Sequence, residues 1–162
     1  MQFTPFVTDQ MVIVTSERHP FADRKSINIK ELEYEKFIVP PPTSGYNQDF
    51  QKACRSAEFE PEIILTCSSV KTILGLVRED LGVAALPAGV ASMDWGFGTK
   101  NLNLIPAINS TIFLATRNKD LFPTLKEFIK FTSKWSQKQT NPDHYKFIPF
   151  KLTISGQKLK SG

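Results

Sequence analysis

Residues 40–45 carry the side chains of this sequence that are best suited to binding a ligand. They read Pro-Pro-Pro-Thr-Ser-Gly and separate an apolar run from an amphipathic one, which places them between a strand and the start of a helix. A helix N-terminus offers free N–H groups and partial positive charge, which suit a small anion. The Thr43 and Ser44 hydroxyls can donate to the same anion, and Gly45 lets the backbone approach it. An ordinary serine cap followed by a glycine turn explains the same residues without a ligand.

A second junction of this type lies at Ser68 and Ser69. An apolar run precedes it, and a stripe of apolar residues at helical spacing follows it. One serine suffices to cap a helix, so a purely structural role is the simpler interpretation here. Ser69 stays a candidate ligand contact beside Thr43, Ser44 and Gly45.

Catalytic signatures are absent from the sequence. It has two histidines, His19 and His144, and neither has a metal ligand or triad partner nearby in the chain. The motifs HExxH, GxSxG, GxxxxGK[ST] and GxGxxG do not occur, and the Gly96-Phe97-Gly98 loop has no helix signature after it. No reaction type can be assembled from these groups, so the sequence predicts a protein that is not an enzyme and uses no cofactor or metal.

The elements that must position these residues alternate between strand and helix. Apolar runs at 11–14, 37–39, 63–65 and 81–87 predict strands, and the spacing at 26–32, 47–57 and 69–78 predicts helices. This alternation indicates an α/β fold with a mostly parallel sheet. After a loop at 92–100, strands are expected at 101–105 and 111–115 and a helix at 122–135. Residues 147–154 could form an edge strand or part of a disordered extension.

Composition fits an ordinary α/β protein of 162 residues. The formal charge is +4, but many basic residues fall in residues 134–160, so a solvated tail explains the excess better than a DNA-binding face. Cys54 and Cys67 lack metal-ligand spacing and are expected to be reduced thiols. Without a signal peptide or a long apolar run, the sequence predicts a soluble, cytoplasmic protein that does not bind membranes.

Three segments together resemble the effector-binding domain of LysR-type transcription regulators. They are DQMVIVTSERHPFA at 9–22, INIKELEYEKFIVP at 27–40 and PEIILTCSSVKTILGLVREDLGVAALPAGVA at 61–91. The third is the most specific, with a strand, a serine-capped helix and a segment ending in Leu-Pro. The order and spacing of the segments carry the resemblance, which covers residues 3–135.

The resemblance implies a fold like that of type 2 periplasmic binding proteins, in which a small effector, often an organic anion, sits between two lobes. It implies partial lobe one and crossover at 1–21, a complete lobe two at 22–91, and return strands with the final helix of lobe one at 92–136. Residues 137–162 form a polar, basic extension without a counterpart. Family members contact the ligand at the position of Thr43 and Ser44, and they are homo-oligomers that bind operator DNA through a separate domain.

Several features depart from the family pattern. The winged helix-turn-helix, the linker helix and the first half of lobe one have no counterpart in these residues, so lobe one is partial. Asp80 replaces a family glycine, but Asp can adopt the left-handed conformation at some cost, so the turn is expected to persist. Two other functions stay open: a fragment of a periplasmic-type solute-binding protein, or a dimerisation and interaction module for intact regulators.

Overall fold

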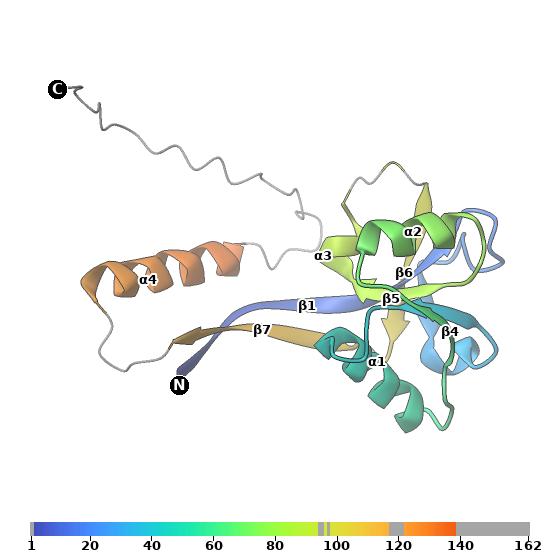
Figure 1. Cartoon of the computed structure of the whole chain (residues 1–162), viewed down its shortest axis with the longest axis horizontal. Coiled ribbons are helices and arrows are strands. Elements are labelled where there is room, and N and C mark those ends of the chain that lie inside the picture. The colour runs from blue at the N-terminus through green and yellow to red at the C-terminus, as the bar shows by residue number, and fades with distance from the viewer. Residues whose placement is uncertain (1, 94–95, 97, 117–121, 139–162) are drawn as a thin grey trace.

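The chain folds into an α/β body from which an extended arm projects (Figure 1). The computed structural model describes residues 2–93, 96, 98–116 and 122–138. The elements, in chain order, are β1 (Gln2–Ser16), β2 (Ser26–Asn28), the 3-10 helix η1 (Ile29–Leu32), β3 (Lys36–Val39), α1 (Gly45–Ser56), β4 (Glu62–Thr66), α2 (Val70–Arg78), β5 (Ala84–Pro87), α3 (Ala88–Ala91), β6 (Thr99–Ile105), β7 (Asn109–Thr116) and α4 (Pro123–Lys138).

Two hydrogen-bonded ladders meet in the body, which comprises residues 11–105. In one, β3 and β4 run parallel, and in the other β2, β6, β1 and β5 lie side by side. The ladders join where the Ile38 N–H donates to the Val83 carbonyl (2.9 Å) and the Val83 N–H donates to the Lys36 carbonyl (2.8 Å). The order across the joined sheet is therefore β4-β3-β5-β1-β6-β2.

Helices cover both faces of this sheet. Because side chains alternate along a strand, β1 contributes Met11 and Ile13 to the cluster under η1 and α1, and Val12 and Val14 to the cluster under α2 and α3. All four side chains are almost fully buried. The body thus has a layer of apolar side chains on each side of β1.

The arm consists of residues 2–10 of β1 together with β7 and α4. β7 runs antiparallel to β1, with Phe3 opposite Ala115 and Thr4 opposite Leu114. α4 lies along this two-stranded ribbon (Figure 1), where Trp135 stacks on Phe6 with ring centroids 6.2 Å apart. β1 is therefore shared between the arm and the sheet of the body.

One sequence prediction about the type of an element is wrong. The helix predicted at 26–32 is a short strand followed by a 3-10 turn, because Ile27 lies opposite Leu104 in a parallel ladder with β6. The prediction of a mostly parallel sheet is confirmed in the body, where β4, β3, β5, β6 and β2 share one direction. β1 runs antiparallel to its neighbours β5 and β6, and in the arm to β7. β1 enters the body from the arm and β7 returns to it, so neither strand follows the strand–helix alternation on which the prediction rested.

The other predicted strands and helices are present, although β1 begins at Gln2 rather than at residue 11, β5 begins at Ala84 rather than at residue 81, and α3 was not predicted. α2 begins directly after Ser69, and α1 begins at Gly45, two residues earlier than predicted. His144 and the proposed edge strand at 147–154 lie outside the described residues. Within the described part of the chain, no helix is long and apolar enough to cross a membrane.

Candidate functional site

Three strand-to-helix junctions share one edge of the body. β3 and β4 are parallel, and the Cys67 N–H donates to the Val39 carbonyl (3.0 Å) where both strands end. Val83, directly before β5, forms a parallel bridge with Phe37 of β3. The segments that follow these strands lead into α1, α2 and α3, so the segments 40–45 and 67–69 start side by side at this edge. In open α/β sheets, ligands bind outside this carboxyl edge.

Polar groups of α1 hold the turn that precedes it. The Asn47 side chain is 2% exposed and donates to the Pro40 carbonyl (2.7 Å). The Gln48 side chain donates to the Pro42 carbonyl (2.9 Å), and the Ser44 N–H donates to the Pro41 carbonyl (2.9 Å). The turn is therefore rigid without any contribution from the side-chain hydroxyls of residues 43 and 44.

The Ser44 hydroxyl is not used to cap α1. Ser44 has the extended backbone of an N-cap residue, but its side chain makes no capping bond. Thr43 is exposed, and a Cβ added to Gly45 would meet nothing within 4 Å. The first N–H groups of a helix have no acceptor within the helix. This junction thus combines open space, two hydroxyl groups and the positive end of a twelve-residue helix.

Ser69 differs from Ser44 in this respect. Its hydroxyl accepts a hydrogen bond from the Thr72 N–H (3.3 Å) and so caps α2. The Cys67 thiol also contacts the Ser69 carbonyl (3.7 Å). Ser69, which the sequence indicates as the weaker candidate for a ligand contact, thus has a structural role as the cap of α2. It still lies at the same edge of the sheet as Ser44.

The structure adds a group of polar residues that the sequence analysis missed, where the arm meets the body. Asp9 of β1 is 8% exposed and accepts a hydrogen bond from the Gly89 N–H (3.0 Å) in α3. The Ser110 hydroxyl of β7 donates to Asp49 of α1 (3.0 Å). Burial raises the pKa of Tyr46, and the negative charges of Asp9 and Asp49 raise it further. These contacts tie β1, β7, α1 and α3 together beside the α1 junction.

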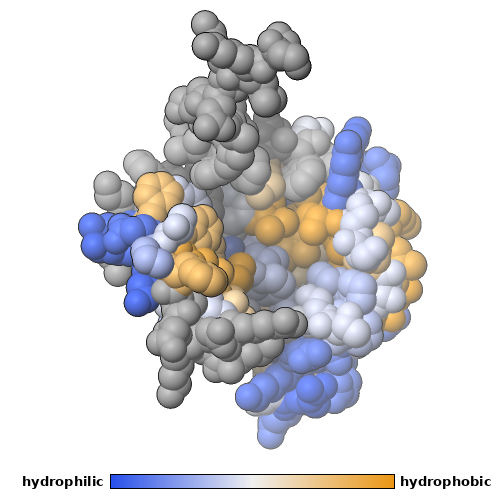
Figure 2. Space-filling view, turned by 60° about the vertical axis from the view of Figure 1, so that its left-hand side comes forward, coloured by the Kyte–Doolittle hydropathy of each residue, from blue (hydrophilic) through white to orange (hydrophobic). Residues whose placement is uncertain are grey.

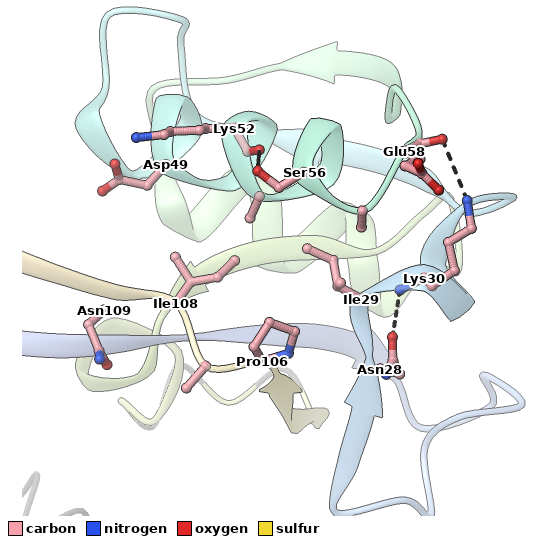
Figure 3. A pocket seen from close by; sticks show the side chains of 13 residues that line it. Asn28, Ile29, Lys30, Asp49, Lys52, Ser56, Glu58, Pro106, Ile108 and Asn109 are labelled. Atoms are coloured by element: carbon pink, nitrogen blue, oxygen red, sulfur yellow. Dashed lines mark hydrogen bonds between the residues drawn. The ribbon is translucent and has the colours of Figure 1, made fainter.

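A groove runs along the flank of α1 (Figure 3). Its volume is about 740 Å³, and it lies between α1, η1 and residues 106–109. Small apolar side chains such as Ala53, Ala57 and Ile108 line it, with Lys52 and Glu58 among the charged residues at its rim. Residues 43–45 and Ser69 do not line this groove. Polar side chains such as Asn28, Asp49 and Asn109 also line the groove, but the groove lacks the unused hydroxyls and the helix N-terminus of the α1 junction, so we regard that junction as the better candidate site.

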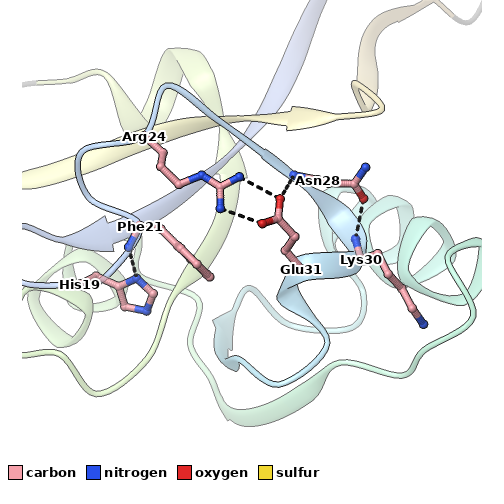
Figure 4. Close-up of polar contacts among 6 residues, drawn as sticks. All are labelled: His19, Phe21, Arg24, Asn28, Lys30 and Glu31. Atoms are coloured by element: carbon pink, nitrogen blue, oxygen red, sulfur yellow. Dashed lines mark hydrogen bonds and ion pairs between the residues drawn. The ribbon is translucent and has the colours of Figure 1, made fainter.

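His19 belongs to a structural contact network at the start of the body (Figure 4). Its Nδ1 accepts from the Phe21 N–H (3.2 Å), so Nε2 carries the proton toward Glu35, 3.3 Å away.

Arg24 forms two 2.8 Å hydrogen bonds with Glu31. The Arg24 guanidinium and the Asn28 N–H lower the pKa of Glu31 to about 2.

Neither cysteine forms a disulfide. Cys54 is buried, and this burial raises the pKa of its thiol to about 12, so the reactive thiolate is scarce at neutral pH. Among the described residues, no group of three or more His, Cys, Asp or Glu side chains could hold a metal ion.

Comparison with known protein families gives a match over nearly all of the described chain. Residues 1–137 match the family described as LysR substrate binding domain. The transcriptional regulator CysL of Bacillus subtilis is 26% identical over an alignment of 136 positions that covers 77% of this chain and 45% of CysL. CfxR of Cupriavidus necator is 32% identical over 82 residues, or 51% of this chain and 26% of CfxR. The chain thus spans less than half the length of these curated relatives.

Solved structures show the same fold. The effector binding domain of QuiR in complex with shikimate is 24% identical, with a TM-score of 0.72 over 85% of this chain and 66% of that one. The regulatory domain of CcmR from Synechocystis PCC6803, in complex with 2-PG, is 19% identical, with a TM-score of 0.73 over 84% of this chain and 67% of that one.

Proposed function

Because the chain belongs to the LysR substrate-binding domain family, we propose that it binds a small organic anion and thereby controls transcription in a full-length regulator. The anion would contact Thr43, Ser44 and Gly45, with Ser69 at the neighbouring junction. The observation that carries this proposal is the free hydroxyl of Ser44 at the N-terminus of a long helix. A carboxylate there would accept hydrogen bonds from backbone N–H groups and from the two hydroxyls.

The charges near the junction favour a ligand with a single carboxylate. Asp9 and Asp49 lie close enough to Tyr46 to raise its pKa, and each already accepts a hydrogen bond from the protein. Their negative charges oppose a second anionic group on the ligand. Hydroxyl groups on the ligand would instead find acceptors here. Shikimate, the ligand of the QuiR structure, combines one carboxylate with several hydroxyls, which supports this class of effector.

The division of the chain into lobes is also a proposal. Residues 1–21 would be the partial first lobe and crossover, 22–91 lobe two, 92–136 the return to lobe one, and 137–162 an extension. β6 pairs with β1 and β2 in the body, which favours placing the return crossing at residues 106–108. In the full-length protein, a separate DNA-binding domain, homo-oligomer formation and a cytoplasmic location would follow the family pattern.

The curated relatives are described as transcriptional regulators, and this favours gene regulation over a solute-binding role in transport. We also expect that this chain alone does not recognise operator DNA. A gel-shift assay with the promoter region of its own gene tests this expectation. Sequence-specific retardation by the 162-residue chain would contradict it.

A thermal-shift screen of hydroxylated monocarboxylic acids tests the ligand site. An acid that raises the melting temperature of the wild-type chain should lose most of its effect with Thr43→Ala and Ser44→Ala. Ser56→Ala is the matched control, because Ser56 lies at the other end of α1 and its hydroxyl bonds only the Lys52 carbonyl (3.0 Å). An undiminished shift in the Thr43 and Ser44 variants would place the ligand elsewhere.

A further inference from the structure

The groove along the flank of α1 has charged residues at both ends and apolar side chains between them. Asp49 and Lys52 lie at one end, and Lys30 and Glu58 lie at the other (Figure 3). The lower side of the body, where α1 lies in Figure 1, is mostly hydrophilic on its outer surface (Figure 2). The middle of the groove is instead apolar, with Ile29, Ala53, Ala57, Pro106, Ala107 and Ile108. Its volume of about 740 Å³ lies within the range of about 300–1,000 Å³ of small-molecule sites.

One charged residue at each end of the groove already has a partner within the protein. The Lys30 ammonium forms an ion pair with Glu33 (3.3 Å) and lies 5.7 Å from the centre of the Phe59 ring. At the other end, the Asp49 carboxylate accepts the hydrogen bond from the Ser110 hydroxyl (3.0 Å). The charges of Lys30 and Asp49 are therefore partly satisfied without a ligand.

Lys52 and Glu58 carry the remaining charges of the groove. Within the described part of the chain, no ion pair or hydrogen bond joins the Lys52 ammonium or the Glu58 carboxylate to another residue. Lys30 donates to the backbone carbonyl of Glu58 (3.5 Å) and not to its side chain. An unused cation and an unused anion thus lie at opposite ends of an apolar groove. A ligand with opposite charges at its own two ends would complement both.

The backbone conformation of Glu58 is unusual for a residue with a side chain. Its φ is 65°, in the left-handed region that glycine usually occupies where a helix ends. The Phe59 N–H donates to the Cys54 carbonyl (3.1 Å) across this turn and so closes α1. Glycine would close the helix without strain, and strained residues of other types cluster at binding sites. Here the strain places a carboxylate at the negative end of the α1 dipole, where a cationic group is favoured.

Two asparagine side chains on the opposite wall suit the polar groups of a peptide backbone. Asn28 lies toward the Lys30 end of the groove and Asn109 toward the Asp49 end (Figure 3). The Asn28 side-chain oxygen accepts the Lys30 N–H (3.0 Å), so its NH₂ group remains available as a donor. The Asn109 side chain makes no hydrogen bond to the other described residues. A side-chain amide both donates and accepts hydrogen bonds, as a peptide group does.

We propose that this groove binds a short peptide with free termini and apolar side chains. Its carboxylate pairs with Lys52 and its ammonium group with Glu58, so the peptide runs antiparallel to α1. Lys52 and Glu58 are six residues apart in the chain, which corresponds to about 9 Å along a helix axis. An extended chain of about three residues spans roughly 10 Å, so a tripeptide fits this spacing. The groove does not include residues 43–45, so this site stands or falls independently of the effector site.

Titration of the ¹⁵N-labelled 162-residue chain with the tripeptide Ala-Leu-Ala, followed by NMR, tests the proposal. We expect the amides of residues 28–30, 53–58 and 107–109 to shift together, with a dissociation constant of about 1 mM or lower. Acetylation and amidation of the two termini should weaken binding about fivefold or more, because both end charges are lost. No shifts at about 10 mM peptide, shifts centred on residues 43–45, or equal binding of the capped peptide would each overturn the proposal.

Lys52→Gln and Glu58→Gln show which end of the peptide each residue binds. Lys52→Gln should lower the affinity for the free peptide about threefold but leave the affinity for the C-terminally amidated peptide unchanged. Glu58→Gln should do the same for the free and the N-acetylated peptide. Lys71→Gln is the matched control, because Lys71 is exposed on α2, on the other face of the sheet. A loss of affinity that does not depend on the matching terminus would overturn the proposed orientation and pairing.

Glu58→Gly provides a readout that separates ligand binding from folding. Glycine relieves the left-handed strain, so the melting temperature without peptide should rise by about 2 °C or more. The same variant should bind the free tripeptide as weakly as Glu58→Gln does. A lower melting temperature would show that the Glu58 side chain stabilises the turn itself, and this would overturn its assignment to a ligand.

Discussion

The Ser16 hydroxyl donates a 2.6 Å hydrogen bond to the Asp80 carboxylate and so links the end of β1 to the turn after α2. Asp80 has a φ of 61°, which confirms the left-handed turn expected where the family has glycine. The Leu81 N–H donates to the Leu76 carbonyl (3.3 Å) and closes the end of the helix. The hydrogen bond from Ser16 offsets part of the conformational cost of a non-glycine residue at this position.

Substitutions at Asp80 should separate these two effects. Asp80→Ala loses the hydrogen bond and keeps the left-handed strain, so we expect a loss of about 1–2 kcal/mol in the free energy of unfolding. Asp80→Gly loses the same bond but relieves the strain, so its stability should stay within about 1 kcal/mol of the wild type. Urea denaturation of both variants measures the difference. Equal stability of the two variants would show that the backbone conformation costs nothing here.

Gly82 should tolerate no larger residue. A Cβ at this position would lie 2.6 Å from the Lys36 carbonyl oxygen, and this oxygen accepts the Val83 N–H that joins the two ladders of the body. Gly82→Ala must therefore displace backbone, and we expect a loss of roughly 1–3 kcal/mol. Gly45→Ala is the matched control, because a Cβ there meets nothing within 4 Å. A Gly82→Ala protein as stable in urea as the Gly45→Ala protein would contradict this prediction.

The elements of the body that the sequence predicts well are those with local signals. The apolar stripe of α2 and its serine cap lie within ten residues of each other, and the junction at residues 40–45 is marked by its own prolines and glycine. β2 could not be predicted in this way, because its strand conformation depends on pairing with β6 far along the chain. The spacing of the apolar residues at 26–32 fits a short helix as well as it fits a strand.

The polar contacts of Asp9 and Asp49 beside the α1 junction could not be predicted from the sequence for the same reason. Asp9 and Gly89 are 80 residues apart, and Asp49 and Ser110 are 61 residues apart. No spacing rule connects residues at such separations without the fold. The charge environment of a ligand near Ser44 therefore follows only from the crossing of β1 and β7 over the start of α1.

Glu31 should make the chain less stable in acid. Its pKa is lowered to about 2 by the Arg24 guanidinium and the Asn28 N–H, from a value of 4.5 without these partners. A lowered pKa in the folded state stabilises the protein above pH 4.5, and this contribution is lost as the pH falls from 4.5 toward 2. Melting temperatures of the wild type and Glu31→Gln across this range test the effect.

Glu31→Gln should flatten the decline in melting temperature between pH 4.5 and 2. The effect should shrink in high salt, because the Arg24 and Glu31 side chains are about 40% exposed (39% and 42%). Glu33→Gln, which removes the exposed pair with Lys30 (3.3 Å), is a control for the loss of a carboxylate near η1. Parallel curves for the wild type and Glu31→Gln would rule out this role for Glu31.

The two serines at the helix starts should differ in their effect on stability. Ser69→Ala removes the hydroxyl that accepts the Thr72 N–H, and loss of an N-cap bond costs about 1 kcal/mol. Ser44 makes no such bond, so Ser44→Ala should change the free energy of unfolding by less than about 0.5 kcal/mol. Chemical denaturation without ligand measures both. If Ser44→Ala were the more destabilising, its hydroxyl would be structural and the case for a ligand there would weaken.

The body and the arm should differ in hydrogen exchange. Ile73, Leu74 and Val77 of α2 are buried, whereas α4 contacts a ribbon of only two strands and leaves Phe128 52% exposed. Amides of residues 61–86 should therefore exchange at least about tenfold more slowly than those of residues 111–116 and 122–135, because local stability follows buried apolar contacts. Mass spectrometry of peptides from the two regions measures the ratio. Equal protection would mean that the arm is as stable as the body.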